Sequence, residues 1–180
     1  MEKIKLEVAG VPAVLYGKRS RKVYLYVHGK NGSAAEAARF ARTACPAGWQ
    51  VLAVDLPEHG TRKNSPEKLV PWVVTRELQA VYARMHPVWK HIRVYGVSIG
   101  AWFAMQALQT QKPEKALLVS PVVDMEKLIL ALMQQAGDGG AAARGRGDPH
   151  RLWGDAFVAV SVLGAGAPAA LESTHTGALC

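Results

Sequence analysis

The sequence lacks the features of secreted, membrane-spanning and metal-binding proteins. Its two cysteines, Cys45 and Cys180, are too few for a disulfide framework and show no metal-ligand spacing. No apolar run is long enough to cross a bilayer, and Met1–Lys5 lack the apolar core of a secretion signal. The Gly-rich stretch 29–32 is not followed by the Lys-Ser or Lys-Thr pair of a nucleotide-binding P-loop. We therefore expect a cytoplasmic protein with no cofactor, no metal and no membrane span.

Acidic residues are outnumbered by basic ones, and the formal net charge is +8. Four basic residues gather between two strand-like stretches, at Lys18, Arg19, Arg21 and Lys22. Such a cluster can attract nucleic acid or another acidic partner. Because no nucleic-acid-binding motif accompanies it, we interpret the cluster as a solvated turn and expect no nucleic-acid partner.

Residues 137–180 contain no lysine, isoleucine or tyrosine, whereas residues 1–136 hold all 11 lysines. These 44 positions include 9 glycines and 10 alanines, and only Phe157–Leu163 is strand-like. Two explanations fit. A G+C-rich gene read one nucleotide out of frame would yield such a sequence, or the tail is a natural, divergent and partly disordered C-terminus. We therefore expect a domain over 1–136 and an atypical Gly/Ala-rich tail over 137–180.

Within residues 1–136, strands and helices alternate after an opening pair of strands. Ser33 and Glu36 have the spacing of a capping box at the start of one helix, and Asp124 can cap the last. A hairpin followed by strand–helix–strand units predicts an α/β fold with a mostly parallel sheet and helices on both faces. The expected strands are 3–9, 12–16, 22–28, 50–55, 92–97 and 116–120, and the expected helices are 33–44, 67–85 and 98–109. A last helix is expected to begin at Asp124, with Met125 and Met133 on its apolar side.

The sequence Gly96-Val97-Ser98-Ile99-Gly100 matches the pattern G-x-S-x-G between an apolar strand and an apolar helix. In that setting the serine sits on a sharp, strained turn, and the two glycines remove side chains that would collide there. The N–H groups at the start of the helix can stabilise an oxyanion. Ser98 is therefore a candidate nucleophile. The alternative is a Gly-rich turn with a capping serine.

A second loop, His28-Gly29-Lys30-Asn31-Gly32-Ser33, directly follows the third expected strand. An oxyanion hole needs two N–H donors, and we expect the backbone amides of Ile99 and Lys30 to supply them. The glycines let this backbone turn back toward the site, and His28 is expected to hold the turn by hydrogen bonding. The alternative is an ordinary tight turn.

Four stretches, Val23–Ser33, Val51–Gly60, Val94–Ala101 and Leu117–Asp124, occur in an order that resembles the α/β-hydrolase superfamily, in particular bacterial esterase/lipase-like and serine-aminopeptidase-like hydrolases. The resemblance covers residues 1–136. It implies a small ester or acyl substrate that is hydrolysed through an acyl-enzyme on Ser98. It also implies the first six strands of an eight-stranded sheet, with the last two missing.

The superfamily uses a histidine after the eighth strand and an acid after the seventh, and neither is recognisable here. Asp124, after the sixth strand, is a candidate acid, although capping also explains it. His59 follows the fourth strand at the catalytic edge. We expect it to be a structural residue of that loop, with contact to substrate or a replacement general base as the alternatives, and Asp55 is expected to fix the same loop. The alternative to an enzyme is an inactive truncated fragment or a binding module. We also expect self-association, because missing strands would leave the sixth strand unpaired.

Overall fold

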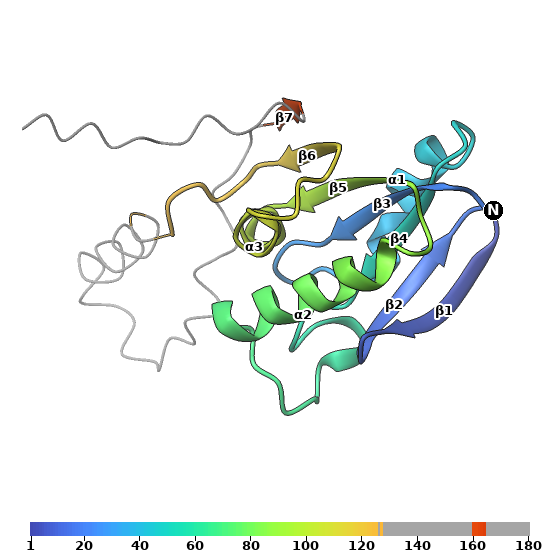
Figure 1. Ribbon diagram of the computed structural model, residues 1–180. Coiled ribbons are helices and arrows are strands. Elements are labelled where there is room, and N and C mark those ends of the chain that lie inside the picture. Colours follow the sequence, from blue (N-terminus) through green and yellow to red (C-terminus); the bar gives the residue numbers. More distant parts are fainter. Residues whose placement is uncertain (126, 128–159, 165–180) are drawn as a thin grey trace, which may run out of the picture.

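A computed structural model of the protein describes residues 1–125, 127 and 160–164 (Figure 1). The described strands form one sheet in the order β1-β2-β4-β3-β5-β6-β7. Their bounds are β1 Lys3–Val8, β2 Val11–Tyr16, β3 Lys22–Val27, β4 Gln50–Val54, β5 His91–Val97, β6 Lys115–Val119 and β7 Val160–Gly164.

The directions of the strands confirm the predicted hairpin and mostly parallel sheet. β1 and β2 form an antiparallel hairpin, and β2 pairs antiparallel with β4. β4, β3, β5 and β6 then run parallel to one another. The chain moves from β3 outward to β4 and then crosses to β5 on the other side of β3. The carboxyl ends of β3 and β5 are therefore neighbours at a reversal of strand order, where ligands bind in open α/β sheets.

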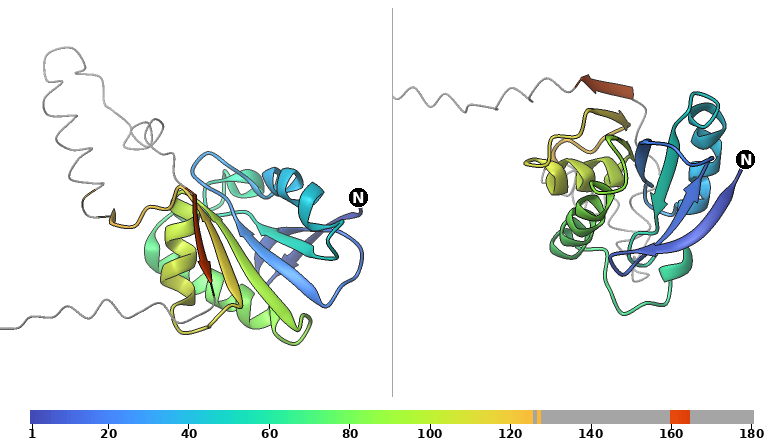
Figure 2. Two further views of the ribbon diagram at one scale, coloured as in Figure 1. Left: turned by 90° about the horizontal axis from the view of Figure 1, so that it is seen from above. Right: turned by 45° about the vertical axis from the view of Figure 1, so that its right-hand side comes forward.

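Helices cover both faces of the sheet because side chains alternate along the strands. Val23, Leu25 and Val27 of β3 belong to a core packed under α2 and α3, whereas Tyr26 faces a second core beneath α1. The two helix layers are visible in Figures 1 and 2. The helical segments are η1 Ala34–Glu36, α1 Ala37–Ala44, η2 Gly60–Arg62, α2 Pro71–Met85 and α3 Ile99–Leu108.

One expected helix start is correct in position but lacks its expected cap, and another is wrong. The helical stretch begins at Ala34, directly after the expected cap Ser33. The capping box does not form, because neither Ser33 nor Glu36 makes a side-chain cap bond. The first amide of the helical stretch, Ala34 N–H, donates to Asp55 Oδ1 at 2.7 Å, so the bond at this helix start comes from an acceptor distant in sequence. The helix expected from residue 67 begins at Pro71, in the first turn, where a missing N–H costs no helical hydrogen bond.

The expectation of an unpaired β6 edge is also wrong. Val160–Gly164, which overlaps the strand-like stretch Phe157–Leu163, pairs antiparallel with β6, from Val119↔Val160 to Lys115↔Gly164 (Figure 2). In the described sheet β7 therefore takes the place of β6 as the outer strand. Its antiparallel direction differs from the parallel run of β4, β3, β5 and β6. Most of the expected last helix and the rest of the tail lie outside the described residues.

Candidate active site

Ser98 lies between β5 and α3 in a backbone conformation that side chains disfavour. Its φ of 50° and ψ of −121° match the first central position of a type II′ turn, which glycine normally occupies. Ser98 N–H donates to Val119 O at 2.8 Å, and Ser98 O accepts from Ala101 N–H at 3.0 Å. β6 and α3 thus hold the strained turn that the sequence predicts, and we expect the strain to cost about 1–3 kcal/mol.

This strain leads to a prediction. Ser98→Gly should raise the free energy of unfolding by about 1 kcal/mol, because relief of strain exceeds the entropy that glycine adds to the unfolded chain. Ser98→Ala, the matched control, retains a Cβ and should not gain stability. Urea denaturation followed by circular dichroism would measure both. Equal stabilities of the two variants would contradict the prediction.

The two glycines of the motif permit close packing around Ser98. A Cβ on Gly96 would lie 2.6 Å from Ala101 Cα, and a Cβ on Gly100 would lie 2.1 Å from His28 O. A Cβ on Gly29 would lie 3.4 Å from Ser98 Cβ. The loop after β3 therefore lies directly against the serine turn, as the sequence predicts.

His28 braces this loop from within the core. Its ring is fully buried, Nδ1–H donates to Gly29 O at 2.7 Å, and Nε2 accepts from Leu56 N–H at 3.0 Å. Burial lowers the pKa of His28 to about 4. The ring is therefore neutral near pH 7, with its proton on Nδ1. The predicted role of His28 in holding the turn is confirmed.

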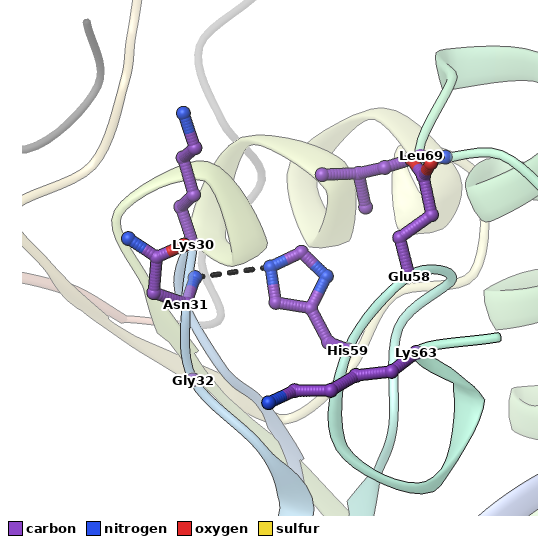
Figure 3. A pocket seen from close by; sticks show the side chains of 7 residues that line it. All are labelled: Lys30, Asn31, Gly32, Glu58, His59, Lys63 and Leu69. Atoms are coloured by element: carbon purple, nitrogen blue, oxygen red, sulfur yellow. Dashed lines mark hydrogen bonds between the residues drawn. The ribbon is translucent and has the colours of Figure 1, made fainter. Parts of the chain in front are cut away.

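His59, in the loop after β4, bonds to the loop after β3 in the same way that His28 bonds to the loop after β4. Its Nδ1–H donates to Pro57 O at 2.7 Å, and Nε2 accepts from Asn31 N–H at 3.0 Å (Figure 3). The centres of the two imidazole rings are 5.2 Å apart. Each loop thus places a histidine against a backbone amide of the other loop. This pairing is not predicted from the sequence, although both histidines share one local feature, a glycine directly after them.

Asp55 and Arg62 fix the loop that carries His59. Asp55 Oδ2 accepts from Thr61 N–H at 3.0 Å and from Thr61 Oγ1–H at 2.8 Å, which confirms the expected role of this aspartate. The buried Arg62 donates to both carboxylate oxygens of Glu77 on α2, at 2.8 and 2.7 Å, and to Asp55 O at 3.2 Å. These bonds raise the pKa of Arg62, mainly through the hydrogen bond to Glu77. The loop is consequently anchored to both β4 and α2.

A pocket of about 320 Å³ lies between the two loops (Figure 3). In the loop after β3, Gly29 therefore lies against the serine turn, and the three residues after Gly29 line this pocket. The carboxylate of Glu58 is engaged by Lys68 Nζ and Leu69 N–H, each at 3.0 Å. The residues lining the pocket are Lys30, Asn31, Gly32, Glu58, His59, Lys63 and Leu69.

Within residues 1–125, the Ser98 hydroxyl makes no hydrogen bond to a histidine or an acid. His28 and His59 bond to backbone groups, and His91 bonds to Glu114. Asp124 Oδ1 accepts from Lys127 N–H at 2.9 Å, so this aspartate caps the following turn as predicted. His150 and His175 lie outside the described residues.

Among the residues that the structure describes, no cluster of three or more potential metal ligands occurs. None of the helices in this part of the chain is long and apolar enough to span a membrane.

No protein-family model matches the chain, and no curated protein matches it. Three similar solved structures are a Thermus thermophilus protein (22% identity, 74% of this chain and 66% of that one, TM-score 0.56), a Bacillus coagulans carboxyl esterase (16%, 77% and 51%, 0.57) and a Paleococcus ferrophilus monoacylglycerol lipase (17%, 76% and 51%, 0.55). This chain spans between about half and two thirds of their length. The strand order, the strained serine turn and these similarities agree that the chain has the α/β-hydrolase fold.

Proposed function

We propose that this protein is a serine hydrolase that cleaves a carboxylic ester or related acyl bond through an acyl-enzyme on Ser98. The observation that carries the proposal is the strained backbone of Ser98, which the surrounding contacts hold in place. Strain of this kind persists where structure over-determines it and clusters at active sites. An esterase and a monoacylglycerol lipase among the structures of similar fold support an ester as substrate.

The chemistry requires a donor pair for the oxyanion that forms when Ser98 Oγ attacks a carbonyl. Ile99 is the first residue of α3, so its N–H lies at the positive end of the helix dipole. The second proposed donor is Lys30 N–H. Its peptide group includes Gly29 O, which accepts from His28 Nδ1–H and from Gly32 N–H at 3.1 Å. Because a trans peptide is planar, fixing Gly29 O also fixes the direction of Lys30 N–H.

The serine hydroxyl also needs a general base, and an acid must orient that base. The histidines in residues 1–125 are engaged with other groups, and we propose that the base lies outside the described residues. Asp124 remains the proposed candidate for the acid, although its carboxylate also serves as a cap. Without a base, the chain would be an inactive fragment or a binding module, and the same experiment decides between these functions.

A fluorophosphonate probe tests the proposal, because it reacts covalently with an activated serine. We expect the 180-residue chain to be labelled and Ser98→Ala to abolish labelling. Ser65→Ala, which removes a serine from the loop before α2, serves as the control and should leave labelling unchanged. Absence of labelling in the unmodified chain, or labelling that survives Ser98→Ala, would overturn the proposal.

A further inference from the structure

We propose that His59 is a positioning residue for the oxyanion loop, here defined as residues 28–32. Its Nε2 accepts the Asn31 N–H and thereby orients the peptide group that follows Lys30. The inference rests on the proposed function, since it concerns the residue assigned there as the second oxyanion donor. It assigns His59 a part in the site other than contact with the substrate.

Lys30 lies between two peptide groups, and a histidine holds each of them. His28 Nδ1–H binds Gly29 O in the peptide before Lys30, whereas His59 Nε2 binds Asn31 N–H in the peptide after it. Since each peptide is a rigid plane, these bonds restrict both backbone torsions of Lys30. The direction of Lys30 N–H therefore depends on both rings, and removing one leaves one plane without its side-chain brace.

The backbone of Asn31 increases the need for this brace. Asn31 has a φ of 61°, in the left-handed region that asparagine tolerates and most residues avoid. Its side chain is exposed, so packing does not hold it there. The bond from Asn31 N–H to His59 Nε2 is consequently a contact that ties the backbone of Asn31 itself to the neighbouring loop.

His59 can orient Asn31 N–H because hydrogen bonds and burial hold His59 itself in a defined position. The residue is 8% exposed, and the bond from Nδ1–H to Pro57 O leaves Nε2 as the acceptor. Its backbone N–H donates to Leu56 O at 3.1 Å, and its carbonyl accepts from Arg62 N–H at 2.7 Å. Asp55 and Arg62 anchor the same loop to β4 and α2. The oxyanion loop is therefore bonded to the loop after β4, which is itself anchored to β4 and α2.

The test compares His59→Leu, which removes the acceptor, with His59→Gln, whose amide oxygen can accept from Asn31 N–H. For His59→Leu we expect kcat for a short p-nitrophenyl ester, and the rate of fluorophosphonate labelling, to fall by about 10- to 100-fold with little change in KM. His59→Gln should recover most of this loss. His86→Gln, which alters a histidine packed on Tyr82 instead, is the matched control and should match the unmodified chain.

A second readout does not depend on activity. In nuclear magnetic resonance spectra of the full chain, His59→Leu should shift the Lys30 amide signal and speed hydrogen exchange at Asn31, and His59→Gln should reverse both changes. Unchanged signals at both residues would overturn the inference even if Ser98 is reactive. An increase in KM alone would also overturn it, since that result indicates direct substrate contact. Shifted signals in a chain that no probe labels would overturn the proposed function and leave His59 as a structural brace only.

Discussion

Gly100→Ala is expected to lower the free energy of unfolding by at least about 3 kcal/mol. The added Cβ would lie 2.1 Å from His28 O, 2.7 Å from Val27 O and 2.9 Å from His28 C. All three are backbone atoms, so no flexible side chain can move aside. Relief requires α3 to shift away from the end of β3, which would open the site and the core between them. Urea denaturation followed by circular dichroism would measure the loss.

Whether Gly100→Ala raises or lowers the free energy of unfolding distinguishes the effect of packing from that of helix propensity. Gly100 lies within α3, where alanine is better than glycine by about 1 kcal/mol in helix propensity. Propensity alone therefore predicts a more stable variant. Gly48→Ala is a suitable control, because Gly48 has a φ of 80° but no atom within 4 Å of an added Cβ. It should cost only about 1 kcal/mol of backbone strain. A Gly100→Ala variant as stable as the unmodified chain would contradict the packing argument.

Local patterns predicted the features that depend on neighbouring residues. The period-two alternation and the turn residues gave most strand positions, and the motif at 96–100 correctly predicted a strained serine between close-fitting glycines. What lies against those glycines was not predictable, because His28 is 72 positions from Gly100 and meets it only through the strand order. The resemblance to hydrolases predicted that the loop after β3 lies near Ser98. It did not predict that the carbonyl of His28 lies where a side chain at position 100 would be.

Three of the failures have the same physical origin. Ser33 and Glu36 have capping-box spacing, yet the side-chain bond at this helix start comes from Asp55, which directly follows β4 and accepts from Ala34 N–H. Phe157–Leu163 was recognised as strand-like, but its hydrophobic pattern carries no information about partner or direction. The His28–His59 pairing likewise joins two loops that are separate in sequence. These three features are contacts between distant segments that only the folded sheet creates, whereas the late start of α2 at Pro71 is a local feature.

Arg62→Met is expected to destabilise the chain by about 3–5 kcal/mol, because it breaks a buried ion pair by removing one partner. Arg62 is 5% exposed and binds both oxygens of Glu77, whose side chain is 21% exposed. Methionine keeps the apolar volume but leaves the Glu77 carboxylate without its cation. The change also releases the carbonyl of Asp55, so the loop that carries His59 loses its link to α2. Thermal and urea unfolding would measure the loss.

Two companion variants test this explanation. Lys68→Met breaks the pair with Glu58, where the lysine side chain is 68% exposed, and should cost no more than about 1 kcal/mol. The double variant Arg62→Met/Glu77→Leu removes both charges of the close pair and should recover much of the stability lost in Arg62→Met. The other carboxylate near Arg62, that of Glu67 at 3.7 Å, is 44% exposed and remains solvated without its partner. If the double variant is as unstable as Arg62→Met, the loss comes from the packing and backbone bond of Arg62, and the ion pair is not its cause. If Arg62→Met lowers the free energy of unfolding by no more than Lys68→Met does, the buried ion pair contributes no more stability than the exposed one, which would contradict the prediction.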